Sequence, residues 1–292
     1  MLLDVCICTY RRRQVLETLA SLARQRLDSG WKMSVIVADN DLEPSARAAV
    51  LQAAAEYGLD VRYIHAPGRN ISIARNACLD YADGDWIAFI DDDETASPGW
   101  LTALLEKAAE ADAVFGPVKA VYGEEVPGWL REGDFHSTRA VYHGGRIDTG
   151  YAGNVLIRRS AIEATNLRFD LACGVSGGED TVFFGQMASA GLRLVEAPEA
   201  LAFEPVPKER TTLRWLARRT WRSGQSHASM VLANSGASIA PTRALLSTAK
   251  TARCIVGMAR KVGSALGWRW WLLRGLLHCG MAVRFVGCRA LL

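Results

Sequence analysis

The first hundred residues alternate between short apolar runs and longer segments in which apolar residues recur every three or four positions. The short runs are typical of β-strands, and the longer segments have the spacing of amphipathic helices. Strands separated by helices of this length indicate βαβ units and a mostly parallel sheet. Because the apolar runs are unbroken, we expect both faces of the strands to be covered. The predicted strands are 3–8, 33–38, 60–65 and 85–90, and the predicted helices are 14–27, 43–57, 71–82 and 97–110.

The pattern becomes looser after Asp112 and changes again after Pro207. Segments 113–122 and 153–159 have strand character with glycine-rich connections, and 181–191 has helical character. From Pro207 onward the chain is rich in Arg, Trp, Leu and Ala. This change predicts an α/β domain over residues 1–205 and a helical region over 206–292.

Charge is distributed unevenly between these two parts. The net charge of the 292 residues is only +3. Residues 206–292 hold 15 Lys and Arg against one acid, Glu209, a net charge of +14, and the other 19 basic residues face 30 acids, a net charge of −11. An acidic domain with a basic tail indicates that the tail meets an anionic partner.

The segment 244–266 has the pattern of a basic amphipathic helix. At about 100° per residue, its four basic residues fall within an arc of about 100°. They are Lys250, Arg253, Arg260 and Lys261, and the apolar side consists of Ala252, Ile255, Val256, Ala259, Val262 and Leu266. Such a helix is typical of segments that lie in a membrane interface. A helical cap packed on the first domain is the alternative.

The residues after this helix also indicate a membrane surface. Trp268, Trp270 and Trp271 cluster as aromatic residues do at membrane interfaces. No uninterrupted apolar span of about 20 residues exists, so we predict no transmembrane helix. We expect an anionic membrane surface as a partner and no nucleic acid, because no nucleic-acid-binding motif accompanies the charge.

The compartment is predicted from the cysteines and the N-terminal residues. The seven cysteines contain no CxxC pair and no metal-type spacing, which indicates a reducing compartment. The first residues, "MLLDVCICTYRRR", lack the order of charge, apolar run and cleavage site that defines a signal peptide. We therefore expect a cytoplasmic protein.

Polar side chains follow several predicted strands at the point where each strand ends. Thr9 and Tyr10 follow the first strand, Asp39 follows the second, and three aspartates at 91–93 follow the strand that ends at Ile90. In open α/β sheets, ligands bind beyond the carboxyl ends of the strands. Crowded carboxylates are tolerable when Mg²⁺ or Mn²⁺ neutralises them and bridges them to substrate phosphates. A solvated acidic turn that caps the next helix is the alternative.

Five stretches, taken in order, resemble glycosyltransferase family 2. They are "VCICTYRR" (5–12), "VIVADND" (35–41), "GRNISIARN" (68–76), "FIDDDE" (89–94) and "GGED" (177–180). The resemblance covers roughly residues 1–205 and implies an α/β nucleotide-binding fold of the GT-A type, to which the basic helical tail is added. "NVLIRRS" (154–160) and "EPVPKER" (204–210) are similar to the succinoglycan-type glucosyltransferases within that family.

The resemblance implies roles in nucleotide binding for several of these residues. Thr9 and Tyr10 would line the nucleobase and ribose pocket. Asp39 would accept a hydrogen bond from uracil, and Arg75 would lie near the base or the diphosphate. Many family members have two adjacent acids where this chain has "ADND", which leaves open whether Asp41 shares the role of Asp39.

The resemblance also implies a metal site and a base. Asp91, Asp92 and Asp93 match the DxD element, which holds the ribose and the metal, with Asp93 and Asp91 as the metal ligands and Asp92 on the nucleotide sugar. Asp180 in "GGED" matches the general base that takes a proton from the acceptor. From the residues alone, a helix N-cap is the better explanation of Asp180, and the two roles are compatible.

These roles imply an inverting, metal-dependent glycosyltransferase. We expect the protein to take its sugar from a UDP-sugar, such as UDP-glucose, and to extend a lipid-linked saccharide during surface polysaccharide synthesis. It would be peripheral on the inner, cytoplasmic face of the cell membrane. A metal-dependent nucleotidyltransferase and a catalytically silent membrane scaffold are the alternatives.

Overall fold

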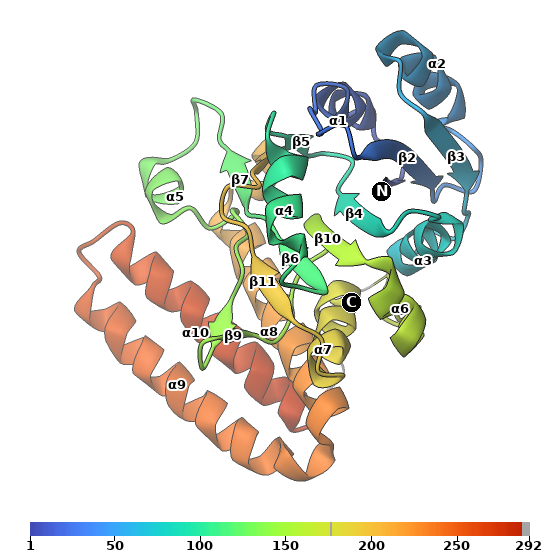
Figure 1. The fold of residues 1–292 in the computed structure, drawn as a ribbon. Helices are drawn as coiled ribbons and strands as arrows, with labels where there is room; N and C mark the ends of the chain where they lie inside the picture. The colour runs from blue at the N-terminus through green and yellow to red at the C-terminus, as the bar shows by residue number, and fades with distance from the viewer. Residues whose placement is uncertain (176, 288–292) are drawn as a thin grey trace. The chain divides into compact units, whose positions relative to one another are not determined.

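The computed structural model describes residues 1–175 and 177–287, which form two compact units (Figure 1). Unit 1 contains residues 1–120 and 137–204. Unit 2 contains residues 121–136 together with the chain from Pro205 onward. The inclusion of 121–136 in unit 2 has no counterpart in the composition change near Pro207.

A seven-stranded sheet forms the centre of unit 1. Its strand order is β11-β6-β10-β4-β1-β2-β3. The pairs on either side of β10 are antiparallel, and the other neighbouring pairs are parallel, so the expected mostly parallel sheet is confirmed. The bounds are β1 Leu2–Thr9, β2 Lys32–Asp39, β3 Val61–His65, β4 Trp86–Ile90, β6 Ala113–Phe115, β10 Asn154–Arg158 and β11 Leu194–Glu196.

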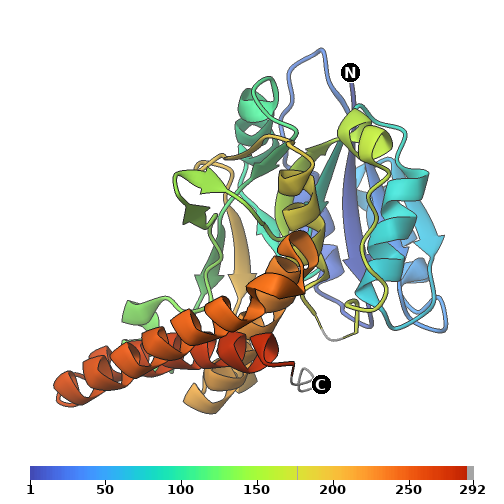
Figure 2. The same ribbon diagram turned by 90° about the horizontal axis from the view of Figure 1, so that it is seen from below.

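Helices cover both faces of this sheet because successive side chains of each strand point to opposite sides. In β1, Leu3, Val5 and Ile7 enter one core with side chains of α1, α2 and α4. Cys6 and Cys8 enter the other core with side chains of α3, α6 and α7. Figure 2 shows α3 and α7 in front of the strands. The bounds are α1 Val15–Leu22, α2 Arg47–Tyr57, α3 Ile71–Tyr81, α4 Trp100–Ala108, α6 Arg159–Thr165 and α7 Glu179–Ser189.

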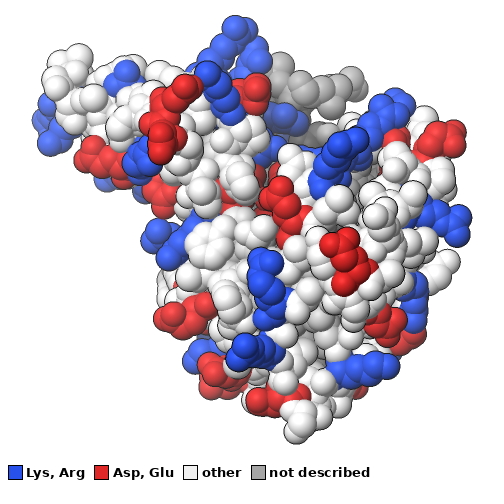
Figure 3. All heavy atoms as spheres, turned by 90° about the horizontal axis from the view of Figure 1, so that it is seen from above, with Lys and Arg blue, Asp and Glu red and all other residues white. Residues whose placement is uncertain are grey.

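Two small sheets complete the described strands. One has the order β5-β12-β7, and the other pairs β8 with β9. Their bounds are β5 Thr95–Ala96, β7 Val118–Val121, β8 Tyr142–His143, β9 Arg146–Ile147 and β12 Ala202–Pro205. Acidic and basic side chains are interspersed over the molecular face in Figure 3, so this face carries no large field of one sign.

Unit 2 consists of helices, with a small core around Leu130, Leu216 and Leu273. The long helix α10 packs along both α8 and α9, and Figure 2 shows α9 and α10 side by side in orange and red. The helix predicted over 244–266 starts earlier and ends at Arg260. The bounds are α5 Gly128–Gly133, η1 Lys208–Arg210, α8 Leu213–Ser235, η2 Ala237–Ile239, α9 Ala240–Arg260 and α10 Gly267–Phe285.

Glycines bring these helices into close contact. A Cβ at Gly280 would collide with the main-chain oxygen of Trp221 in α8, and one at Gly224 would collide with that of Leu277 in α10. A Cβ at Gly257 in α9 would collide with the indole of Trp271 in α10. Within residues 1–175 and 177–287, no helix has the length and apolar character needed to cross a bilayer.

Candidate active site

The ends of three parallel strands bring the predicted ligand-binding residues to one edge of the sheet. Thr9 at the end of β1 is in register with Asp39 at the end of β2. β4 lies on the other side of β1 and ends at Ile90, directly before the three aspartates. The Oγ1 of Thr9 donates a hydrogen bond of 2.8 Å to Oδ2 of Asp92. The structure therefore brings the first strand end and the acidic segment into direct contact.

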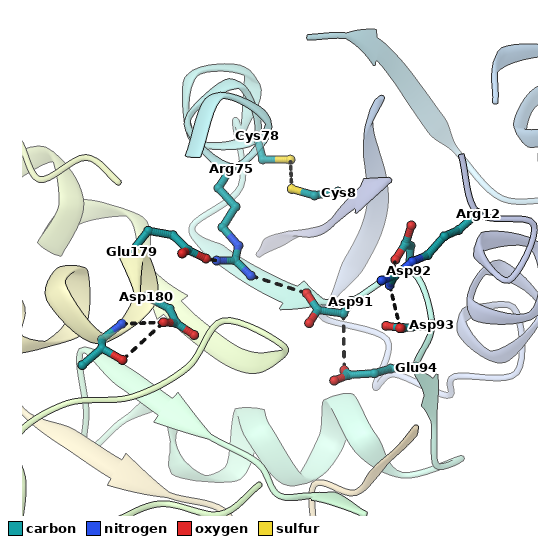
Figure 4. A network of polar contacts seen from close by, with 11 residues as sticks. Cys8, Arg12, Arg75, Cys78, Asp91, Asp92, Asp93, Glu94, Glu179 and Asp180 are labelled. Carbon is teal, nitrogen blue, oxygen red and sulfur yellow. Dashed lines mark hydrogen bonds and ion pairs between the residues drawn. The ribbon is translucent and has the colours of Figure 1, made fainter. Parts of the chain in front are cut away.

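Two arginines contact the three aspartates (Figure 4). Nη1 of Arg12 lies 2.9 Å from Oδ1 of Asp92 and 2.6 Å from Oδ2 of Asp93. Nη2 of Arg75 lies 3.5 Å from Oδ1 of Asp91. Burial raises the pKa of Asp92 to about 6, although Arg12 and the Thr9 hydroxyl favour its charged form. The acidic segment is thus a set of paired side chains and not a solvated turn.

Asp39 is fully buried, and the surrounding chain already donates to both of its oxygens. Oδ1 accepts from the backbone N–H of Asp41 at 3.0 Å. Oδ2 accepts from the N–H of Ala46 at 2.9 Å and from the hydroxyl of Tyr63 at 2.6 Å. Burial, together with the hydrogen bond to Asp39, raises the pKa of Tyr63. The nucleobase role of Asp39 stays a prediction, and Tyr63 is a partner that sequence reasoning did not identify.

Asp41, which follows β2, pairs with an arginine that follows β1 at the same edge of the sheet. Nε of Arg11 donates to Oδ2 of Asp41 at 2.8 Å, and this hydrogen bond lowers the pKa of Asp41. The guanidinium of Arg11 also lies 5.4 Å from the ring centroid of the exposed Tyr10. Arg11 has a φ of 56°, a region that side chains other than glycine rarely adopt and that often occurs near functional sites.

Arg75 connects the acidic segment to α7. Its side chain is buried, and its guanidinium pairs with Glu179 on one side and Asp91 on the other (Figure 4). The other carboxylate oxygen of Glu179 is buried without a hydrogen-bond partner in the described part of the chain. Sequence reasoning placed Arg75 near the base or diphosphate and assigned no role to Glu179. The only available signal was the position of Glu179 directly before Asp180 in "GGED".

Asp180 lies in the first turn of α7, after two glycines with positive φ. Gly177 and Gly178 have φ values of 86° and 95°, which glycine adopts without steric cost. The helix N-cap is Gly178, so Asp180 is not the cap that its sequence position also allowed. Its Oδ1 accepts a hydrogen bond of 2.6 Å from the N–H of Thr181. Burial raises the pKa of Asp180, and the charge of Arg75 partly offsets this effect. A raised pKa brings a carboxylate closer to the range that suits a general base.

The segment before Asp180 is held by α3. Oγ of Ser72 donates to the carbonyl of Asp170 at 2.8 Å, and the amide of Asn76 both donates to and accepts from the main chain of Phe169. The N-terminal N–H groups of α3 are also used: Ile71 donates to the carbonyl of Gly174, and Ser72 donates to the side chain of its own N-cap, Asn70. The stretch "GRNISIARN" therefore positions the "GGED" segment, a role that its sequence did not reveal.

The acidic segment fits a divalent cation that arrives with phosphate. Among the residues that the structure describes, no three His, Cys, Asp or Glu side chains converge as a complete metal cage. Mg²⁺ and similar hard ions are commonly bound by one or two carboxylates together with substrate phosphates. Asp91 and Asp93 provide such hard oxygen ligands at the edge where nucleotides bind in this class of sheet.

Comparison with known proteins gives consistent results. A model of glycosyl transferase family 2 matches residues 4–165. The succinoglycan biosynthesis protein ExoM of Rhizobium meliloti (strain 1021) is 46% identical over 289 residues, which are 98% of this chain and 94% of that protein.

Two solved structures share the fold, which confirms the expected GT-A architecture. One is the mannosyltransferase PcManGT from Pyrobaculum calidifontis, in complex with GDP-Man and Mn²⁺. Its TM-score is 0.64 at 18% identity, with 98% of this chain and 87% of that chain covered. The other is TarS 1–349 of S. aureus in complex with UDP. Its TM-score is 0.56 at 17% identity, with 99% of this chain and 92% of that chain covered.

Proposed function

This chain belongs to glycosyltransferase family 2, and on that basis we propose that it is an inverting, metal-dependent enzyme that transfers a sugar from a UDP-sugar to a lipid-linked saccharide. The observation that carries the proposal is the position of Arg75. Its guanidinium contacts both Asp91 and the first turn of α7. One proposed metal ligand, Asp91, and the helical turn that carries the proposed base therefore contact the same buried guanidinium.

In this proposal, the residues that bind the donor and the residue that acts as base lie on opposite sides of the transferred sugar. Thr9, Tyr10, Asp39, Arg75, Asp91 and Asp92 bind the nucleotide sugar. Asp93 and Asp91 would hold Mn²⁺ or Mg²⁺, which when bound would offset the charge that develops on the departing diphosphate. Asp180 takes the proton of the attacking acceptor hydroxyl on the opposite side.

The nucleotide and the metal are supported by the fold relatives. TarS 1–349 is seen with UDP and PcManGT with GDP-Man and Mn²⁺. We assign UDP to this chain because Asp39 matches the family position that accepts a hydrogen bond from uracil. The similarity to the succinoglycan biosynthesis protein ExoM supports a surface polysaccharide as the product. We propose glucose as the sugar to test first.

A reaction assay tests this function. The protein is incubated with Mn²⁺, a lipid-linked acceptor extract and one of several labelled donors: UDP-glucose, UDP-galactose, UDP-N-acetylglucosamine or GDP-mannose. We expect release of UDP and label in the lipid fraction. Release of pyrophosphate would instead identify a nucleotidyltransferase, and no turnover with any donor would favour the silent scaffold.

The outer face of α9 supports a membrane location for this reaction. Large apolar residues of this helix face solvent: Leu245 is 71% exposed, and Ile255 and Val256, which belong to the predicted apolar side, are 57% and 50% exposed. The buried residues of α9 are instead Ser247, Cys254 and Gly257. The apolar side is therefore not used to pack the helices of unit 2.

The charge beside this apolar side is complementary to anionic lipid. Lys250, Arg253, Arg260 and Lys261 are all exposed, and the sequence contains no acid after Glu209. An exposed apolar stripe with a basic flank is typical of helices that lie in an anionic bilayer surface. We therefore place the enzyme on the inner face of the cell membrane, where a lipid-linked acceptor is accessible.

A further inference from the structure

Arg12 makes an unusual contact for a residue next to a proposed metal site. It lies three residues after the end of β1, and a single nitrogen, Nη1, contacts both Asp92 and Asp93 (Figure 4). The side chain of Arg12 is 40% exposed, whereas those of Asp92 and Asp93 are 6% and 16% exposed. Arg12 therefore approaches two largely buried carboxylates from the solvent side.

This guanidinium places its positive charge next to the carboxylate that a divalent cation would need. Oδ2 of Asp93, the oxygen that contacts Arg12 at 2.6 Å, belongs to the carboxylate assigned to the metal. A cation at Asp93 would meet the positive charge of Arg12 at short range, and like charges at such a separation repel. Metal binding at Asp93 therefore requires Arg12 to move away or a further anion to arrive.

The two arginines of the site differ in their freedom to move. Arg75 is buried and pairs on two sides with Asp91 and Glu179. Arg12 lies at the surface, and its long side chain can reach a new partner by rotation about its own bonds. A diphosphate bound beside Asp93 would be such a partner, because a guanidinium pairs with phosphate oxygens as well as it does with carboxylate oxygens.

We propose that Arg12 is a positioning residue that makes metal binding depend on the nucleotide: it occupies Asp93 in the free protein and moves to the diphosphate when the nucleotide binds. The inference rests on the proposed function, which assigns the metal to Asp93. In the free protein the ion pair lowers the affinity for the metal. With nucleotide bound, the same arginine stabilises the diphosphate and frees the carboxylate. By linkage, metal and nucleotide then raise each other's affinity by the same factor.

The test measures Mn²⁺ binding and needs no turnover. The dissociation constant of Mn²⁺ is measured by the electron paramagnetic resonance signal of the free ion, without nucleotide and with saturating UDP. The full chain is compared with Arg12→Gln and Arg12→Lys. Arg13→Gln is the matched control, because Arg13 is the adjacent exposed arginine and has no ion pair with these aspartates within the described residues. Thermal melting verifies that each variant is folded.

We expect Arg12→Gln to bind Mn²⁺ about fivefold more tightly without UDP, the size typical for loss of a partly exposed charge contact. The factor by which UDP increases Mn²⁺ affinity should shrink accordingly. In chelator, the affinity of Arg12→Gln for UDP should fall by about fivefold, because the diphosphate loses a cation. The affinities of Arg12→Lys for Mn²⁺ and UDP should lie between those of the parent and Arg12→Gln. Those of Arg13→Gln should match the parent.

The possible results separate this inference from the proposed function. If Arg12→Gln binds Mn²⁺ no more tightly than the parent without UDP, the inference is overturned, while the metal site stands. Unchanged UDP affinity of that variant in chelator would overturn the movement to the diphosphate. A parent protein that binds no Mn²⁺ even with saturating UDP would overturn the metal-dependent function and the inference together.

Discussion

Asp93 and Asp180 differ in what surrounds each carboxylate, and this difference gives each a separate experimental signature. Asp93 contacts a surface arginine at the sheet edge. Asp180 lies in the first turn of a helix, next to a glutamate that is paired with a buried arginine. We therefore expect substitution of Asp93 to change ligand binding and substitution of Asp180 to change the chemical step.

The first prediction concerns Asp93. Asp93→Asn should abolish transfer and weaken UDP binding in Mn²⁺, but should not weaken UDP binding in chelator, because only the metal-mediated part of the affinity is lost. Calorimetry with UDP under both conditions measures this. Asp60→Asn, which alters an exposed aspartate at the start of β3, is the control and should match the parent. Equal metal-dependent affinity in Asp93→Asn and the parent would remove Asp93 from the metal site.

The second prediction concerns Asp180 and pH. Asp180→Asn should lower transfer by about 10² or more and leave UDP binding nearly intact. Burial raises the pKa of Asp180 above the ordinary 3.8, so the carboxyl takes up its proton at a higher pH than an exposed aspartate does. Since only the deprotonated form accepts a proton, kcat/KM should fall as the pH drops through this raised pKa. A pH profile measured across the acidic range decides the matter, and near-normal turnover of Asp180→Asn would exclude the base role.

At the scale of secondary structure elements, α3 positions the segment that carries the base. The side chains of Ser72 and Asn76 bond to the main chain of residues 169–170, directly before the glycine turn at 177–178. Asn76 makes two of these bonds with Phe169, at 2.8 and 2.9 Å. The position of Asp180 therefore depends on a helix about one hundred residues earlier in the chain.

The third prediction follows from this contact. Asn76→Ala leaves the N–H and C=O of Phe169 without their side-chain partners, which costs about 1–3 kcal/mol for each buried group. We expect faster amide hydrogen exchange in residues 169–175 and slower transfer, with UDP affinity close to that of the parent. Thr165→Ala on α6 removes a hydrogen bond within that helix and serves as the control. Unchanged exchange in Asn76→Ala would show that the segment keeps its position without α3.

Sequence patterns predicted the helices and strands of unit 1 well, but they did not predict the side-chain contacts between elements that are distant in the sequence. The unbroken apolar runs predicted the central strands, because a strand buried on both faces needs apolar residues at every position. The strand-end position of Asp91 and Asp92 was equally informative. Periodicity carries no signal for contacts between distant segments, so neither the Glu179–Arg75 pair nor the Arg12–Asp93 pair was predictable from it.

The tail shows the same limit for helices. The period of 244–266 predicted a helix with opposed basic and apolar sides, but could not show which side packs inward. In the structure the packed side contains Ser247, Cys254 and Gly257, because small residues allow α9 to approach Trp271 of α10 closely. A pattern based on hydrophobicity does not identify such a side, since glycine and serine score as neither core nor surface.

At the scale of the whole molecule, charge separates the two units less sharply than the composition change near Pro207 indicated. Segment 121–136 belongs to unit 2 and contains one arginine and four acids, Glu124, Glu125, Glu132 and Asp134, a net charge of −3. Added to the +14 that residues 206–292 carry, it leaves unit 2 with +11 in the full sequence. The positive charge is still large, and α9 contributes several exposed basic residues to it.

The fourth prediction is that this charge directs binding to anionic membranes. The protein should float with vesicles of phosphatidylglycerol at low salt, float less as salt rises, and bind neutral vesicles weakly, because salt screens surface charge. Replacing Lys250, Arg253, Arg260 and Lys261 with Gln should reduce flotation. Transfer to a short soluble acceptor should survive, while transfer to a lipid-linked acceptor should fall.

A control of equal charge change makes this test specific. Arg24, Arg26, Lys32 and Lys107 are exposed basic residues of unit 1, and their replacement by Gln removes the same four charges. This control variant should float like the parent. If the α9 variant also floats like the parent, α9 is not the electrostatic anchor. Concentration-dependent self-association of the parent would point to a second copy of the chain as the partner of the apolar side.

The close helix contacts at Gly224, Gly257 and Gly280 have a consequence for which substitutions unit 2 tolerates. In most globular domains the large apolar residues resist replacement, and the small ones accept it more readily. On α9 and at its contacts and those between α8 and α10, the order is reversed. Ile255→Ala on the exposed side of α9 should change the free energy of unfolding by no more than about 0.5 kcal/mol. Gly280→Ala adds one methyl group against the main chain of α8 and should cost about 1–3 kcal/mol in urea unfolding. Random mutagenesis of this region should therefore recover folded variants with altered leucines, isoleucines and valines on α9, and few with altered glycines on α8 and α10.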